Sequence, residues 1–270
     1  KKYLNFVSEL LNCPKEIFVV LDEYKEIIGV LPLIYKEGKY GKVYNSLPYY
    51  GSNGGIITNR DDVTIALIEK LNNLSKSPCT ASITIVENPL TEIKYDGLDF
   101  NLEDKRIGQF TMLPDNLSDQ NQLLDLFHGK TRNVIRKAYK SELDFFVDND
   151  ALNFIRNTHK ENMLSIGGLS KQDQFFHMLP IKFISDLDYK IYIAKYKNQP
   201  IAGVLLFYFN QKVEYFTPVV KKEFRDKQAL SGLIFKAMLD AINFNFRIWN
   251  WGGTWLSQEG VYRFKNRWNS

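Results

Sequence analysis

Two stretches of the chain share a pattern in which two apolar segments flank a short polar turn. They read FVVLDEYKEIIGVLPL at residues 18–33 and YIAKYKNQPIAGVLLF at residues 192–207. Short apolar segments on either side of a polar turn are typical of β-hairpins. Gly29 and Gly203 align when the two stretches are superimposed. The pattern therefore predicts one hairpin in each half of the chain.

The similarity between the two halves continues beyond the hairpins. Each half next has a third strand-like segment with a proline at its exit, then apolar residues at three- and four-residue spacing, as in a helix, and then one more strand-like segment. The paired segments are residues 41–48 and 211–218, residues 61–74 and 229–242, and residues 81–86 and 246–251. The order β-β-β-α-β is thus predicted twice, and it indicates a duplication.

The region between the two copies is predicted to be helical. Apolar spacing over residues 118–143 indicates two helices broken near Gly129, with Ser118 as the N-cap of the first. A further helix is expected over residues 151–163, and residues 171–187 are expected to be helical on both sides of Pro180. We place the domain boundary after residue 115, with a first domain of residues 1–115 and a second of residues 116–270.

Composition narrows the class of protein without defining its partner. Of the 270 residues 44% are hydrophobic and 24% are charged, which is typical of a globular chain. A net charge of +4 does not by itself require nucleic acid or a membrane surface, and we expect no DNA partner. The sequence shows no secretory signal and no apolar run of about 18 residues, so we expect a cytoplasmic protein.

Several kinds of catalytic chemistry find no support in the sequence. Cys13 and Cys79 have no zinc-like spacing and are too few for a disulfide framework, so we expect two buried thiols. The three histidines are scattered over helical segments and are expected to be surface or packing residues; they are His128, His159 and His177. Because there is also no G-x-S-x-G elbow and no Walker sequence, we expect no metal and no tightly bound cofactor.

Direct acyl transfer requires fewer groups, and four short motifs point towards it. They are LPYYGSNGG at residues 47–55, KTRNVIRKAYKSEL at residues 130–143, WNWGGT at residues 249–254 and GVYRFKNRW at residues 260–268. With these motifs the chain resembles the FemABX family of peptidoglycan-bridge aminoacyltransferases and related acyltransferases of the GNAT type. The resemblance implies an α/β (α+β) fold of tandem GNAT-like domains, with mixed, mostly antiparallel sheets flanked by helices.

The resemblance also implies an activity and a set of site residues. The enzyme would transfer an aminoacyl or acyl group, from aminoacyl-tRNA or acyl-CoA, to an amine of a cell-envelope glycan or peptidoglycan precursor. Lys265 would lie near the reacting acyl group, and Phe264 would form a wall of the site. The expected substrate-binding residues are Tyr49, Tyr50, Ser52, Asn53, Arg132, Arg136, Lys137, Tyr215, Arg225, Gly252, Gly253, Thr254, Tyr262 and Arg263.

Two of these groups also follow from the residues themselves. Gly252 and Gly253 fall where the last strand is expected to end, so they predict a tight bend or a close approach to ligand, with the tail folding back as a lid or strand over a cleft between the halves. Arg132 and Arg136 are four residues apart and share a helix face, which suits a diphosphate group. A solvated basic helix face is the alternative.

Departures from the family pattern leave the donor open. The chain reads FKNRWNS where the family has a glycine after its terminal motif, and it has no coiled-coil arm to engage transfer RNA. The segment RDKQAL at residues 225–230 lacks the glycines of an acyl-CoA turn. Two alternatives remain: an acyl-CoA-dependent N-acetyltransferase acting on an amino sugar for surface polysaccharide, and a non-catalytic precursor-binding protein. The protein would meet a small-molecule or lipid-linked precursor, in the latter case peripherally at the inner membrane leaflet.

Overall fold

The computed structural model describes residues 1–47 and 51–270, and its contacts divide the chain into two compact units, residues 1–105 and 106–270. The division precedes the boundary after residue 115 that we predict from the sequence. The reason is β5 (Arg106–Met112), which pairs antiparallel with β10 (Ile248–Trp255). Because its hydrogen-bonding partner comes from the end of the chain, β5 belongs to the second unit.

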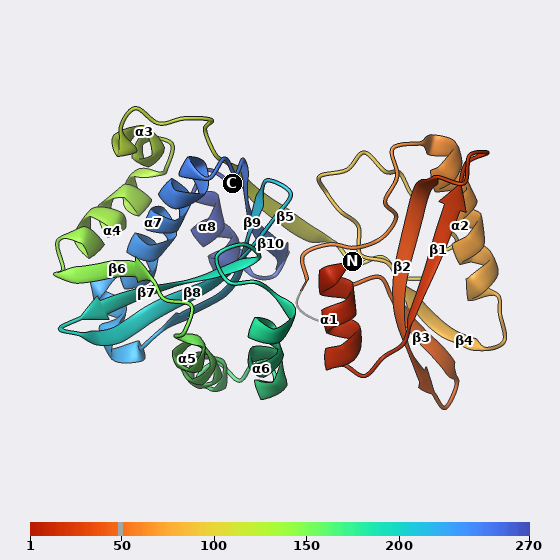
Figure 1. The fold of residues 1–270 in the computed structure, drawn as a ribbon, viewed down its shortest axis with the longest axis horizontal. Helices are drawn as coiled ribbons and strands as arrows, with labels where there is room; N and C mark the ends of the chain where they lie inside the picture. The colour runs from red at the N-terminus through yellow and green to blue at the C-terminus, as the bar shows by residue number, and fades with distance from the viewer. Residues whose placement is uncertain (48–50) are drawn as a thin grey trace. The chain divides into compact units, whose positions relative to one another are not determined.

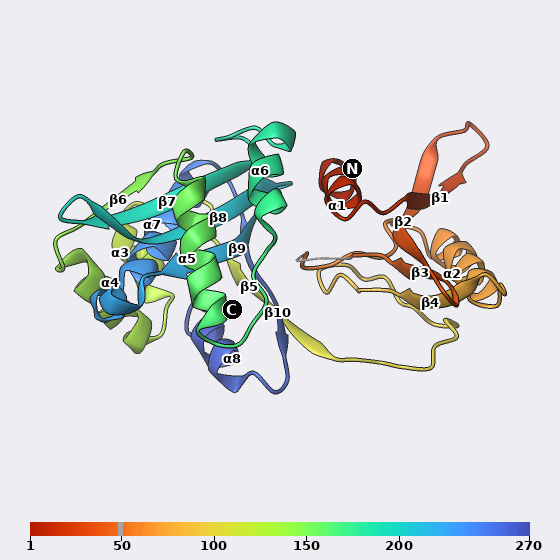
Figure 2. The ribbon, with the colours of Figure 1, turned by 90° about the horizontal axis from the view of Figure 1, so that it is seen from below.

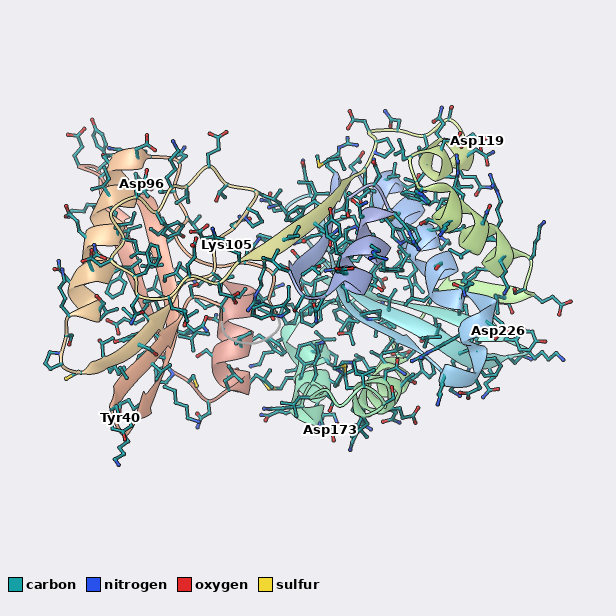
Figure 3. The ribbon with its side chains drawn as sticks, turned by 180° about the vertical axis from the view of Figure 1, so that it is seen from behind. Tyr40, Asp96, Lys105, Asp119, Asp173 and Asp226 are labelled. Carbon is teal, nitrogen blue, oxygen red and sulfur yellow. The ribbon has the colours of Figure 1, made fainter. Side chains whose placement is uncertain are left out.

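The first unit is a four-stranded sheet with a helix packed on it (Figure 1). Its strands are hydrogen-bonded in the order β1-β2-β3-β4, with β3 and β4 parallel and the other pairs antiparallel. Exposed Tyr40 lies at the tip of the β2–β3 hairpin (Figure 3). The elements of this unit are α1 (Lys2–Leu10), β1 (Lys15–Leu21), β2 (Ile27–Gly38), β3 (Gly41–Asn45), α2 (Asp61–Ser75) and β4 (Thr80–Thr84).

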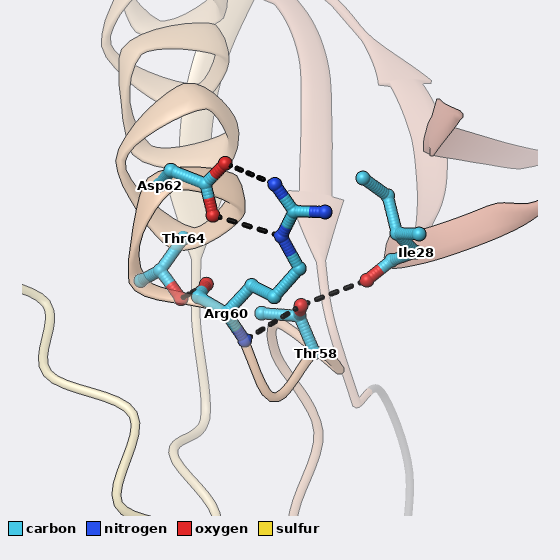
Figure 4. Close-up of polar contacts among 5 residues, drawn as sticks. All are labelled: Ile28, Thr58, Arg60, Asp62 and Thr64. Carbon is cyan, nitrogen blue, oxygen red and sulfur yellow. Dashed lines mark hydrogen bonds and ion pairs between the residues drawn. The ribbon is translucent and has the colours of Figure 1, made fainter. Parts of the chain in front are cut away.

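Polar contacts determine where α2 begins (Figure 4). Thr58 Oγ1 donates to the carbonyl of Ile28 at 2.8 Å and accepts from the backbone N–H of Arg60 at 3.2 Å. The Arg60 guanidinium donates both to Asp62 Oδ1 at 3.0 Å and to Oδ2 at 2.5 Å. The aspartates in the first turn also complement the positive end of the helix dipole.

The second unit is a six-stranded sheet with helices on both faces. The strand order is β5-β10-β9-β8-β7-β6, and β9 and β10 are parallel. Helices α4 and α7 cover one face and α5 and α6 cover the other (Figures 1 and 2). Its further elements are α3 (Gln120–Asp125), α4 (Gly129–Tyr139), β6 (Leu143–Val147), α5 (Leu152–Leu164), α6 (Asp173–Lys182), β7 (Tyr189–Tyr196), β8 (Gln199–Phe209), β9 (Lys212–Val220), the 3-10 helix η1 (Lys222–Lys227), α7 (Ala229–Asn243) and α8 (Glu259–Asn266).

Both units contain the predicted order β-β-β-α-β, as β1-β2-β3-α2-β4 and β7-β8-β9-α7-β10. In each unit the last two strands pair in parallel. This is the mixed α/β architecture with mostly antiparallel sheets that we predict from the sequence. The duplication itself stays a hypothesis.

The two glycines that align in sequence face different layers of their units. A Cβ on Gly29 would meet Val63 of α2, the helix that follows the three strands. A Cβ on Gly203 would instead meet Ile155 of α5, the helix that precedes them. Because successive residues of a strand alternate between faces, the structural alignment of the two strands differs from the sequence alignment by an odd number of residues.

Local details of the helices and cysteines partly differ from expectation. The N-cap of α3 is Asp119, whose side chain accepts from the N–H of Asn121, and Ser118 lies one residue before it. The predicted break near Gly129 is confirmed, because α4 starts there. The two cysteines are free, but Cys79 is exposed and Cys13 only half-buried, so the expectation of two buried thiols is wrong. Across residues 1–47 and 51–270, none of the helices has the length and apolarity needed to cross a membrane.

Candidate functional site

The Gly-Gly pair lies inside strand β10, which corrects the expectation that the strand ends there with a tight bend. Gly252 pairs with Gln109 and Gly253 with Gly108 of β5, and β10 continues to Trp255. The register shifts between Asn250 and Gly252, so that Trp251 forms a β-bulge. Gly252 has φ +72°, a conformation that glycine adopts without strain. Pairing with β5 extends β10 past the two glycines, and the bulge at Trp251 accommodates the change of register.

Lys265 reaches back from α8 to the carbonyls on this part of β10. Its Nζ donates to Thr254 Oγ1 at 2.8 Å, to the Gly253 carbonyl at 3.3 Å and to the Gly252 carbonyl at 3.4 Å. The ammonium group has three hydrogens, so it has one hydrogen for each of these three acceptors. The side chain is buried, with a relative exposure of 7%. The two longer bonds are the ones that an incoming acceptor oxygen could replace at least cost.

A second layer of hydrogen bonds orients the Thr254 hydroxyl. Thr254 Oγ1 donates to Gln109 Oε1 at 3.1 Å, so its lone pairs face Lys265. Gln109 Nε2 donates to the Tyr262 carbonyl at 3.3 Å and to Ser270 Oγ at 3.1 Å. Both side chains are buried. The amide of Gln109 therefore connects β5, β10 and the end of the chain, and it fixes the acceptor that holds the lysine.

Burial lowers the pKa of Lys265 to about 8, because the charged form loses hydration that three neutral acceptors only partly replace. No carboxylate donates or accepts a hydrogen bond in this cluster. The ammonium therefore has no counter-ion among its hydrogen-bonding partners. A cation of this kind stabilises a developing negative charge more strongly than one that is already paired.

The chain end folds back as predicted, but as a helix rather than a lid or strand. Helix α8 lies against β10 (Figures 1 and 2). Trp268 is 1% exposed and packs against Phe127 and Trp251, with ring centroids 5.0 and 5.7 Å apart. Phe264 is 37% exposed and meets Trp251 edge-on, which places a partly accessible ring beside Lys265. Exposed Arg263 pairs with Glu259 at 2.6 Å, and Tyr262 is 38% exposed.

The parallel strands β9 and β10 pair only at their beginnings. Their register covers three residue pairs and ends at Glu214 and Asn250, although β9 continues to Val220 and β10 to Trp255. At this point Asn250 Nδ2 donates to Glu214 Oε1 at 2.7 Å, and Asn250 Oδ1 accepts from the Gly252 N–H at 2.8 Å. Beyond it the facing backbone groups are not bonded to each other. Unpaired strand edges of this kind can form hydrogen bonds with an extended ligand.

Tyr215 lies on β9 just past this point. Its ring packs at 5.0 Å from Trp251, and burial raises the pKa of its hydroxyl. Tyr215 is therefore beside the bulge, as a predicted ligand-binding residue would be. Its contacts in this structure are those of a packing residue.

The basic motif forms α4, whose beginning contacts the chain end. The His128 N–H donates to the Arg267 carbonyl at 3.0 Å, and His128 Nδ1 accepts from the N–H of Lys130. Arg132 lies one turn further on and pairs with Asp125 at 3.3 Å. Arg136 and Lys137 are exposed in the last turn. Of the three predicted α4 residues, Arg132 is the closest in sequence to His128, which contacts the chain end.

The remaining predicted residues lie elsewhere. Tyr49 and Tyr50 fall outside the described residues. Ser52 and Asn53 belong to the first unit, where Asn53 Nδ2 donates to Asn88 Oδ1 at 2.8 Å. Arg225 is exposed on η1, and its carbonyl accepts from the N–H and from the side chain of Gln228. The segment RDKQAL therefore forms a 3-10 turn that enters α7 through Gln228 at φ +56°.

Sequence reasoning did not identify Gln109, Asn250 or Glu214. For Gln109 the sequence does contain a signal. Gln109 and Thr111 are polar residues at alternating positions of a short strand-like segment, residues 106–112. The structure shows that both are buried. Polar residues on the inner face of a strand need hydrogen-bonding partners. Within the described ranges, no group of three or more metal-ligating side chains is placed to hold an ion.

Solved structures place this fold in a known class. The chain aligns with the crystal structure of FemX at 16% identity and a TM-score of 0.75, covering 99% of this chain and 87% of that one. The protein described as L-PGS from Bacillus licheniformis aligns at 14% identity, a TM-score of 0.55, and 99% and 82% coverage. A tandem GNAT protein from the clavulanic acid biosynthesis pathway aligns at 10% identity, a TM-score of 0.52, and 99% and 90% coverage. The chain therefore has the tandem GNAT-like fold.

The sequence itself narrows the class further. The model of the FemAB family matches residues 184–270, which include β7 to β10, α7 and α8. No curated protein sequence matches the chain significantly. Over residues 184–270 the chain is similar to the FemAB family, as its motifs predict, and this similarity indicates an acyltransferase.

Proposed function

We propose that the protein transfers an aminoacyl group from aminoacyl-tRNA to an amine of a peptidoglycan or other cell-envelope precursor, with Lys265 beside the reacting carbonyl. The observation that carries this proposal is the position of Lys265, a buried cation bonded to neutral acceptors at the bulged end of β10. The FemAB match over residues 184–270 supports the choice of reaction.

The chemistry is direct attack. The acceptor amine attacks the carbonyl carbon of the aminoacyl ester, a C–N bond forms, and the ester C–O bond breaks. The proton lost by the nitrogen ends on the 3′-hydroxyl oxygen of the departing tRNA. Because both reactants are held side by side, positioning supplies much of the rate. Lys265 stabilises the oxyanion by donating a hydrogen that it otherwise gives to Gly252 or Gly253.

We assign the acyl end of the donor to the space between β9 and β10, next to Phe264 and Tyr215. The strands are unpaired there, so the backbone can bind an extended segment of the donor. The precursor diphosphate is assigned to Arg132 and Arg136, which bind phosphate in two-pronged fashion. Such a precursor places the enzyme in the cytoplasm, at the inner leaflet when the precursor is lipid-linked.

Transfer assays with defined donors test the proposal. The wild-type chain is incubated with aminoacyl-tRNA or with acetyl-CoA, each with a UDP-linked precursor carrying a free amine, and the product is followed by mass spectrometry. We expect product from aminoacyl-tRNA alone. Product from acetyl-CoA alone would instead support N-acetyl transfer, and precursor binding without any product would support a binding protein.

Variants of the cationic residues assign the roles. Lys265→Met should lower the transfer rate by at least about 100-fold, the scale of losing one oxyanion donor. Arg132→Glu with Arg136→Glu should weaken precursor binding and leave donor hydrolysis unchanged. Lys94→Glu with Lys160→Glu, at two exposed lysines, makes the same change of charge as the double arginine variant and is its control. Wild-type turnover by the Lys265 variant would overturn the role of that residue.

A further inference from the structure

Positive charge is concentrated in the second unit. Residues 1–105 carry 12 basic and 15 acidic side chains, and residues 106–270 carry 23 and 16, so the two net charges are −3 and +7. The modest total of +4 therefore conceals a basic unit. A strongly basic unit attracts polyanions, and its cations define the binding surface where they cluster.

Seven of these cations gather at one end of the six-stranded sheet, and we call this group the η1 surface. This is the end where β9 finishes, β8 begins, β7 finishes and β6 begins, as the pairs Ala202↔Val220 and Leu143↔Tyr196 require. The cations come from η1 and the residue before it, from the β7–β8 turn and from the end of α4. They are Lys221, Lys222, Arg225, Lys227, Lys197, Lys137 and Lys140.

Tyr196 holds part of this surface in place. Lys227 Nζ lies 3.8 Å and Lys197 Nζ 5.4 Å from the centroid of its ring, and Phe224 packs against it at 6.2 Å. Cation–π contacts of this kind keep lysine side chains near one position. Two of the cations are thus positioned before any ligand arrives, so that less side-chain entropy is lost on binding.

The cations of the η1 surface lack anionic partners. Throughout residues 106–270, where every position is described, none of the seven takes part in an ion pair. The acidic side chains on or next to the same elements are Glu142, Glu223 and Asp226, and they leave an excess of four positive charges. Asp226 is exposed and lies at the edge of this unit (Figure 3), which places η1 at the surface of the unit.

We propose that the η1 surface binds the phosphate backbone of RNA, and that it holds the body of a tRNA whose acylated end enters the space between β9 and β10. This rests on the proposed function for the acyl end, because it deepens the identity of the donor. The geometry supports it, since the part of β9 that is unpaired with β10, past Glu214, leads directly to Val220 and η1. A coiled-coil arm is then not needed for the chain to engage tRNA.

The width and composition of the surface favour RNA over a small donor or a membrane. From β9 to β6 the surface spans three strand spacings, about 14 Å, and it continues onto α4. Nucleotide phosphates repeat along such a width, whereas a small donor with its phosphates at the start of α7 would leave the α4 cations unused. A membrane-binding surface carries exposed apolar side chains that insert into lipid. On α4, η1 and the β7–β8 turn the exposed large hydrophobic residue is a tyrosine, Tyr139.

Binding of unacylated tRNA to the full chain tests the surface separately from catalysis. Fluorescence anisotropy is measured from 50 to 300 mM salt for the wild type and for Lys197→Glu/Arg225→Glu/Lys227→Glu. We expect the variant to bind at least 100-fold more weakly at the lowest salt, with a smaller slope of log affinity against log salt, because fewer counterions are released. The control Lys39→Glu/Lys94→Glu/Lys160→Glu makes the same change of charge at exposed positions on other elements and should bind like the wild type. Tyr196→Phe should also bind like the wild type, and Tyr196→Leu more weakly.

Each outcome separates this proposal from the proposed function. If both triple variants bind tRNA equally, or if the wild type does not bind it, the η1 surface is not an RNA site. If the wild type binds vesicles containing phosphatidylglycerol but no tRNA, and the η1 variant binds neither, the surface contacts lipid and the proposal fails. If the η1 variant alone loses tRNA while the wild type transfers nothing from aminoacyl-tRNA, the surface stands and the proposed reaction is wrong.

Discussion

Lys265 Nζ donates to Thr254 Oγ1 at 2.8 Å, the shortest of the three hydrogen bonds that hold this ammonium. The two residues come from different elements, α8 and β10, and meet in a buried position. The contact determines where the charge of the lysine lies and how readily the lysine loses its proton. Four predictions follow from it and from the packing around it.

Transfer should lose rate as the pH rises through about 8, because burial lowers the pKa of Lys265 to about 8 and the neutral amine stabilises an oxyanion poorly. Thr254→Val removes the shortest acceptor and thereby destabilises the charged form, so the alkaline limb of the pH–rate profile should move to lower pH. Thr254→Ser keeps the hydroxyl and should leave the limb in place. Identical profiles for the valine variant and the wild type would contradict the role of the contact.

The stability of the protein should carry the opposite pH signature from the same lysine. Its pKa is about 8 in the folded protein and near the ordinary value of 10.5 in the unfolded chain. Between these values the unfolded state binds more protons, so the contribution of Lys265 to the free energy of unfolding rises with pH from 8 to 10.5. Denaturant unfolding of the wild type and of Lys265→Met, followed from pH 7.5 to 10, should show a rise in the wild type relative to the variant. A constant difference would mean that the lysine titrates normally.

Gln109→Leu should act on the site through Thr254. It leaves the Thr254 hydroxyl and the Tyr262 carbonyl without their partner, which costs about 1–3 kcal/mol of stability for buried groups. We expect a lower kcat, an unchanged KM for the precursor and a shifted alkaline limb. Gln122→Leu, at an exposed glutamine on α3, is the control. A loss of stability with an unchanged pH profile would make Gln109 structural only.

Removal of residues 261–270 should unfold the second unit rather than only inactivate it. Trp268 is buried in the core between Phe127 and Trp251, so Trp268→Ala alone should cost about 3–5 kcal/mol. Arg263→Ala, which breaks one exposed ion pair on the same helix, should cost less than about 0.5 kcal/mol. Thermal unfolding of the Trp268→Ala and Arg263→Ala variants, monitored by tryptophan fluorescence, measures this difference in stability. Equal melting temperatures would show that the helix is dispensable for the fold.

Local sequence pattern was sufficient for the order β-β-β-α-β in each unit, but it did not predict α1, β5, β6 or the helix α8. Three kinds of pattern depend only on neighbours within a few residues, and the structure contains the elements that they predict. They are the apolar segments and polar turns of the hairpins, the helical spacing after Asp61 and after Ala229, and the break at Gly129. The terminal motifs were also sufficient for the resemblance, because the FemAB match covers the stretch that contains WNWGGT and YRFK.

The tertiary structure decided what the site is made of. Gln109 contacts Tyr262 across 153 positions of sequence, and no periodicity within a segment specifies which distant strand will be its neighbour. The same pairing keeps Gly252 and Gly253 inside β10 instead of in a bend. It also turns Lys265 from an apparently solvated residue near the chain end into a buried cation. Burial and hydrogen-bonding partners are properties of the assembled sheet, and they, rather than residue type alone, set the charge that this lysine presents.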